Sequence, residues 1–60
     1  MNESERKTIE TYNRICNTEG ITDYTKEALA HTSEAFAVIF LDGLTAEELN
    51  AWALETEKNW

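Results

Sequence analysis

Few side chains in this sequence could carry out catalysis or bind a metal. Cys16 is the only cysteine, His31 is the only histidine, and Glu47 and Glu48 form an adjacent acidic pair. A thiol activated by a base, or two carboxylates across a substrate, are the arrangements that hydrolytic chemistry uses. One cysteine and one histidine do not supply the four ligands of a structural zinc site. We therefore expect no metal and no cofactor.

Cys16 is the strongest candidate for a nucleophile. It shares an apolar helix face with Tyr12 and Ile15, and Ile21 follows after a turn. No helix N-terminus is predicted beside it, so nothing in the pattern would stabilise a thiolate. The spacing favours a small hydrophobic side chain that packs in the core.

His31 and the acidic pair each have an ordinary structural explanation. Glu27 and Glu34 lie four residues before and three residues after His31, which is typical of a solvated helix face as well as of a pH switch. Glu47 and Glu48 diverge by about 100° on a helix, and acids in a first turn complement the helix dipole. We expect the protein not to be an enzyme.

Composition narrows the class of partner. Residues 1–60 are predicted to form a single small domain, with twelve acidic against five basic residues and a net charge of −7. Nucleic acids and anionic membranes attract basic surfaces, so this balance disfavours direct binding to either and favours a neutral or basic protein. The polar first eight residues do not resemble a signal peptide, and a lone thiol fits a reduced compartment, so we expect a cytoplasmic protein.

The fold is predicted to be all-α. The chain has no proline, and Gly20 and Gly43 divide it into three pieces. Each piece has helical signals, which predicts three short helices in a small bundle, over about residues 3–18, 23–42 and 45–58.

Local capping signals support these helices. Asn2 or Ser4 can cap the first, and "LTAEEL" predicts a capping box in which Thr45 and Glu48 satisfy each other's backbone N–H groups. Thr22, Asp23 and Thr25 are all candidates to cap the second helix. Thr25 is favoured, because it would allow a hydrophobic staple across the first turn.

Residues 35–41 form an uninterrupted apolar run within the predicted middle helix, although residues 31–33 ("HTS") are a weak point where that helix could bend or split. Phe36, Ile39 and Phe40 would face the other two helices, and the rest of the circumference would stay uncovered. We therefore predict a homodimer joined through the middle helix; a compact monomer is the alternative. The predicted interface comprises Ala35, Val38, Ile39, Leu41, Leu54 and Trp60.

The function predicted from these features is a small acidic, non-enzymatic regulator or inhibitor that acts as a dimer on another protein, of the kind that bacteriophages or mobile elements encode. One alternative is an acidic mimic of nucleic acid that blocks a DNA- or RNA-binding protein. Its acidic surface would comprise Glu34, Asp42, Glu47, Glu48 and Glu55. Another alternative is a helix-turn-helix regulator, which the charge of the last helix disfavours.

Overall fold

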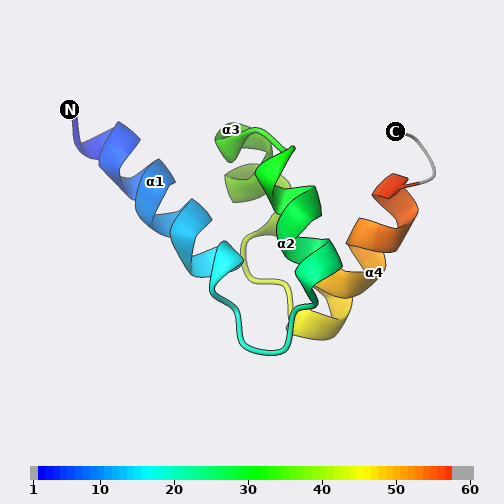
Figure 1. Ribbon diagram of the computed structural model, residues 1–60. Coiled ribbons are helices and arrows are strands. Elements are labelled where there is room, and N and C mark those ends of the chain that lie inside the picture. The colour runs from blue at the N-terminus through cyan, green and yellow to red at the C-terminus, as the bar shows by residue number, and fades with distance from the viewer. Residues whose placement is uncertain (1, 58–60) are drawn as a thin grey trace.

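The computed structural model describes residues 2–57, and every regular element within that range is helical. The helices are α1 (Glu3–Cys16), α2 (Asp23–Ala30), α3 (Glu34–Phe36), which continues as a π-helix, η1 (Ala37–Leu41), and α4 (Ala46–Glu57). The all-α prediction is confirmed. The prediction of three helices is not, because the middle piece is divided (Figure 1).

The division falls at residues 31–33, and side-chain hydrogen bonds explain it. The Thr32 hydroxyl donates to the carbonyl of Ala28 at the end of α2. Ser33 has extended backbone angles, and its hydroxyl accepts from the N–H of Phe36, which caps α3. Serine and threonine side chains compete with the helical hydrogen bonds of the backbone, so this pair ends one helix and begins another. A single helix over 23–42 was therefore wrong.

Of the other three caps, that of α4 agrees with the prediction and that of α2 differs from it. The Asn2 side chain, one of the two candidates, caps α1. In the capping box of α4, the N–H of Thr45 donates to Glu48 at 2.9 Å and the N–H of Glu48 donates to the Thr45 hydroxyl at 3.1 Å. The cap of α2 is Thr22, whereas the favoured Thr25 lies inside the first turn and is completely buried.

The helices pack as two pairs, α1 against α3 and η1, and α2 against α4 (Figure 1). Two glycines with positive φ shape the connections, Gly20 at +99° and Gly43 at +84°. A Cβ atom on Gly20 would lie 3.1 Å from the Cβ of Ala46, so this turn also approaches the first turn of α4 closely. These are conformations that glycine adopts without a steric cost.

The core lies between the two pairs and receives a side chain from each long helix. Its buried members are Ile15, Leu29, Ala37, Leu41 and Leu49, with Tyr12, Cys16, Ile21, Leu44 and Trp52 packed around them. Most of these side chains are small or aliphatic. The two phenylalanines, Phe36 and Phe40, are not part of this core.

Candidate interaction surface

The apolar run presents to solvent the face that was expected to be covered. Ile39 and Phe40 are 71% and 63% exposed, whereas Leu41 is 2% exposed. Since residues 31–33 break the helix, the side of residues 34–41 that faces the core is not fixed by the orientation of α2. Ala37 and Leu41, four residues apart on one side, point into the core. Leu41 was therefore wrong as an interface residue, and Phe36 and Phe40 belong on the outside.

Three aromatic rings lie close together, and the exposed Ile39 precedes one of them in η1. The ring centroids of Phe36 and Phe40 are 4.8 Å apart, and those of Phe36 and Trp52 are 6.5 Å apart, both in tilted arrangements. Such spacings are typical of favourable aromatic pairs. We call Phe36, Ile39, Phe40 and Trp52 the aromatic patch. It joins α3 and η1 to α4, so residues distant in the sequence contribute to one surface.

A recess lies beside the aromatic patch and shares two of its residues. Its volume is about 310 Å³, and it is lined by His31, Thr32, Ser33, Phe36, Trp52 and Thr56. Aromatic rings form part of its lining, and hydroxyl groups and an imidazole form another part. The break between α2 and α3 thus supplies the polar side of the recess.

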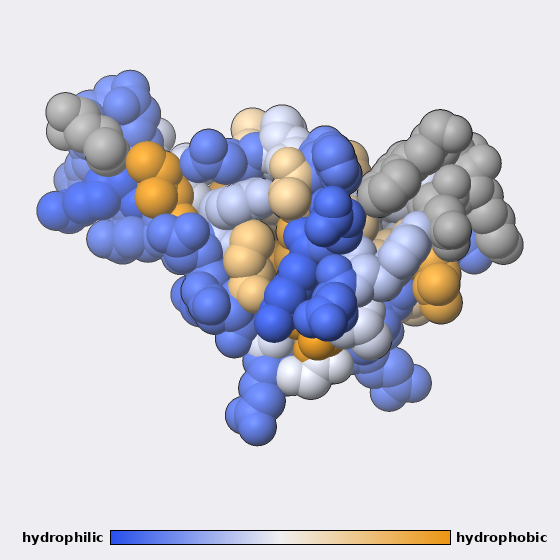
Figure 2. Space-filling model, in the orientation of Figure 1, coloured by the Kyte–Doolittle hydropathy of each residue, from blue (hydrophilic) through white to orange (hydrophobic). Residues whose placement is uncertain are grey.

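The remaining residues of the predicted interface do not join this patch. Ala35 is exposed and lines a separate recess with Ile9 of α1, and the half-buried Val38 lines another with Lys7. Leu54 is 58% exposed on α4. Trp60 lies outside the described residues. On the face seen in Figure 2, hydrophilic residues predominate, and the strongest apolar areas lie apart over α1 and α4.

All five residues of the predicted acidic surface are exposed, and Asp42 and Glu48 hold parts of the fold together. Asp42 accepts a hydrogen bond of 2.6 Å from the guanidinium of Arg14, which ties the end of η1 to α1. Glu48 belongs to the capping box of α4. Glu34, Glu47 and Glu55 lie on the surfaces of α3 and α4.

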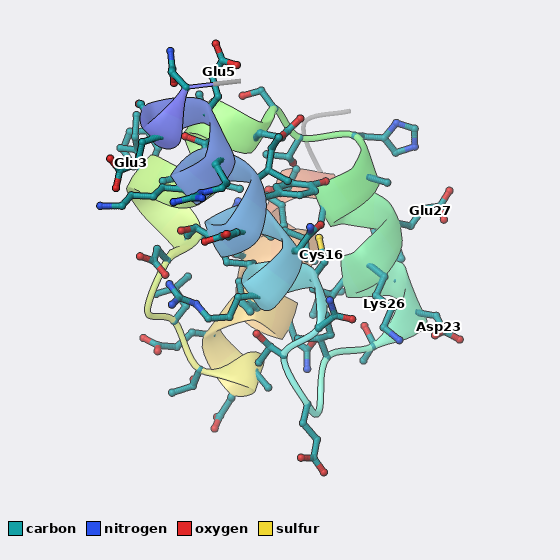
Figure 3. The ribbon with its side chains drawn as sticks, turned by 90° about the vertical axis from the view of Figure 1, so that its left-hand side faces the viewer. Glu3, Glu5, Cys16, Asp23, Lys26 and Glu27 are labelled. Atoms are coloured by element: carbon teal, nitrogen blue, oxygen red, sulfur yellow. The ribbon has the colours of Figure 1, made fainter. Side chains whose placement is uncertain are left out.

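Charge is distributed unevenly along the chain. Residues 27–57 contain seven carboxylates and one histidine, and no lysine or arginine. Within the described residues, the basic side chains belong to α1 and to Lys26 of α2, which projects outward beside Glu27 (Figure 3). His31 Nε2 lies 3.9 Å from Glu27. The residues of the aromatic patch therefore come from the acidic part of the sequence, whereas α1, which packs against α3 and η1, carries Arg6, Lys7 and Arg14.

Cys16 and His31, two residues considered for catalysis, lie in different surroundings. Cys16 is the last residue of α1, is half-buried and points toward the core, as expected for a small hydrophobic side chain (Figure 3). Tyr12 donates a hydrogen bond from its hydroxyl to the carbonyl of Leu29. Burial raises the pKa of Tyr12, and the neighbouring Cys16 and Glu34 raise it further. His31 is exposed on the surface.

Residues 2–57 contain no group of three or more histidine, cysteine, aspartate or glutamate side chains arranged to hold a metal ion. None of the helices in this range has the length and apolar character needed to cross a membrane. Comparison of the chain with models of protein families, with curated proteins and with solved structures gave no match.

Proposed function

We propose that this protein is a small, non-enzymatic regulator or inhibitor that acts by binding another protein through its aromatic patch. The observation that carries the proposal is the exposure of Ile39 and Phe40 beside Phe36 and Trp52. A chain of 60 residues has few large apolar side chains, and burying them internally would add stability that a small domain needs. Aromatic residues gathered on the surface are typical of protein contact sites.

A homodimer is one way to cover the patch. Two copies related by two-fold symmetry would each contribute the same surface, and the added burial would offset the small size of each core. In this form of the proposal the dimer interface is the aromatic patch, and it does not include Ala35, Val38 and Leu41. Leu54 also lies outside this dimer interface.

The two nucleic-acid alternatives have weaker support. A mimic would rely on the exposed carboxylates, of which Asp42 and Glu48 already have intramolecular partners. A helix-turn-helix would use α4 for recognition, but residues 46–57 contain four glutamates and no lysine or arginine. Phosphate contacts require the opposite charge.

The test is affinity capture of proteins from an extract of the source cell. The immobilised protein is the 60-residue chain in three forms: wild type, Phe40→Ser and Leu54→Ser. Both substitutions replace an exposed apolar side chain, but only the first lies in the patch, so Leu54→Ser is the matched control. We expect proteins retained by wild type and by Leu54→Ser to be lost with Phe40→Ser. If all three forms retain the same proteins, the patch is not the binding site. Retention that high salt abolishes in all three forms alike would instead support the acidic mimic.

A further inference from the structure

We infer that the recess beside the aromatic patch binds the phenol side chain of a tyrosine that belongs to another protein. The inference rests on the proposed function, because it takes this face as a protein contact site, and it adds the chemistry of the side chain that anchors the partner. The recess has a volume of about 310 Å³, and residues 31–33, α3 and α4 all contribute to its lining. This is the lower end of the size range of ligand pockets, which suits a single aromatic ring.

The lining of the recess has no permanent charge. None of its six members is acidic, and none is lysine or arginine. Its one titratable member is His31, whose Nε2 lies 3.9 Å from the carboxylate of Glu27, one turn earlier in α2. A charged group that entered the recess would lose its water without gaining an opposite permanent charge from the lining. The recess therefore favours an uncharged occupant.

Two aromatic rings form the apolar side of the recess. The ring centroids of Phe36 and Trp52 are 6.5 Å apart, and the ring planes are tilted by 32°. Aromatic rings attract one another at centroid distances of about 4.5–7 Å, in tilted as well as in offset arrangements. A third ring in the recess would contact both residues in this way. An aromatic occupant therefore matches this side of the recess better than an aliphatic one.

The polar side of the recess can both donate and accept a hydrogen bond. The Thr32 hydroxyl donates its proton to the carbonyl of Ala28, so its oxygen can still accept. The Ser33 hydroxyl oxygen accepts from the N–H of Phe36, so its proton can still be donated. A hydroxyl group is both donor and acceptor, and in tyrosine it is carried by an aromatic ring. The rings and the hydroxyls of the lining together match a phenol.

A second copy of this chain is a poor source of that phenol. The sequence contains two tyrosines, Tyr12 and Tyr24, and both are half-buried. The Tyr12 hydroxyl donates to the carbonyl of Leu29, and the hydroxyl oxygen of Tyr24 is buried. Neither could enter the recess of another copy without leaving its place in the fold. Tyrosine is enriched at protein interfaces, where aromatic anchors in pockets dominate binding, so the occupant is a tyrosine of a different protein.

The test is a nuclear magnetic resonance titration of the isotope-labelled 60-residue chain. The probes are N-acetyltyrosinamide, N-acetylphenylalaninamide and the O-phosphorylated form of the first. We expect the tyrosine probe to shift the amide signals of the residues that line the recess, with a Kd of millimolar order. The phenylalanine probe should bind about threefold to tenfold more weakly, since it lacks the hydroxyl, and the phosphorylated probe should bind about tenfold or more weakly.

A matched pair of variants locates the site on α4. Thr56→Phe fills the recess and should abolish the shifts, whereas Leu54→Phe adds a ring outside the recess and should leave the Kd within about twofold of wild type. Circular dichroism verifies that both variants fold. Binding of the tyrosine probe to Thr56→Phe as tightly as to wild type would overturn the inference. So would the absence of shifts in wild type, or a Kd for either of the other probes that is equal to or lower than that of the tyrosine probe.

Two further measurements separate the possible occupants. Free p-cresol that binds at least tenfold more tightly than the tyrosine probe would assign the recess to a small phenol and overturn the protein partner. In sedimentation equilibrium, a dimer that Thr56→Phe dissociates and Leu54→Phe does not would show that a second copy fills the recess, which also overturns the inference.

Phe40 keeps the inference distinguishable from the proposed function, because it belongs to the aromatic patch but does not line the recess. If the tyrosine probe fails while Phe40→Ser still loses the captured proteins, the inference is wrong and the proposed function stands. If the probe binds as expected but Phe40→Ser retains the captured proteins, the recess binds a phenol and the aromatic patch is not the contact site.

Discussion

The hydroxyl of Thr25 donates a hydrogen bond of 2.6 Å to Oδ1 of Asn50, which joins the buried side of α2 to α4. The same oxygen accepts from the N–H of Thr22 at 3.0 Å, and the Asn50 amide group donates to the carbonyl of Gly20 at 3.2 Å. One side chain thus satisfies a buried hydroxyl and two backbone groups of the preceding turn. Buried polar groups need such partners, so Asn50 holds the two helices and their connection in register.

Replacement of Asn50 with alanine should destabilise the protein by about 1–3 kcal/mol, because the Thr22 N–H and the Gly20 carbonyl lose their side-chain partner and the buried Thr25 hydroxyl keeps only its contact with the Thr22 hydroxyl. Chemical denaturation measures the change. Asn17→Ala is the matched control, since Asn17 is exposed and its side chain bonds only to the carbonyl of Asn13 in the preceding turn. If the two variants unfold at the same denaturant concentration, the Asn50 contacts contribute little.

Truncation of Leu41 should lower the stability of the protein strongly, whereas truncation of Ile39 should hardly change it. Leu41→Ala removes a buried side chain and should cost about 2–5 kcal/mol, enough to unfold much of so small a domain. Ile39→Ala removes a side chain that is 71% exposed and should change stability by about 0.5 kcal/mol or less. Thermal unfolding of both variants tests which side of residues 34–41 faces the core. A larger loss of stability for Ile39→Ala than for Leu41→Ala would mean that Ile39, and not Leu41, faces the core.

Thr45 should contribute to stability through the capping box of α4. Thr45→Ala leaves the N–H of Glu48 without its hydroxyl acceptor and should cost about 1 kcal/mol, which corresponds to roughly 4–8 °C in the melting temperature. Glu47→Gln removes a charge from the same turn without touching the box and should cost less. Equal shifts would show that dipole compensation matters here and the cap does not.

The ion pair between Arg14 and Asp42 should contribute weakly in spite of its 2.6 Å distance. The two side chains are 70% and 41% exposed, so water and salt screen their attraction. A double-mutant cycle with Arg14→Met and Asp42→Asn should give a coupling of about 0.2–1 kcal/mol that declines as salt is added. A coupling that does not change with salt would contradict this screening.

Tyr12 should make the fold sensitive to alkaline pH. Its pKa is raised in the folded protein, mainly by burial, so above about pH 10 the unfolded chain releases a proton that the folded state retains. Its contribution to stability is complete below that pH and is lost as the pH rises toward the folded pKa. The free energy of unfolding of the wild type should therefore fall more steeply above about pH 10 than that of Tyr12→Phe. Parallel curves would exclude Tyr12 as the source.

The parts of the fold that short segments determine could be predicted from the sequence. The capping box of Thr45 and Glu48 requires only residues three apart, and Asn2 caps α1 by the same local geometry. The break at residues 31–33 also has a visible signal, since Thr32 and Ser33 both have hydroxyls that compete with helical bonds. The preference for Thr25 over Thr22 as a cap failed because Thr25 has a distant partner, Asn50.

The candidate surface required the tertiary structure. The sequence by itself determined the helical class, the capping box of α4 and the presence of an apolar run in an acidic chain, because each depends on composition or on residues within one or two turns of each other. Only the tertiary structure decided that Leu41 faces the core and Phe40 faces solvent, and that Phe36 meets Trp52. Once the break separates α3 from α2, the rotation of residues 34–41 depends on packing against α1 and on the core, and no local pattern carries that information.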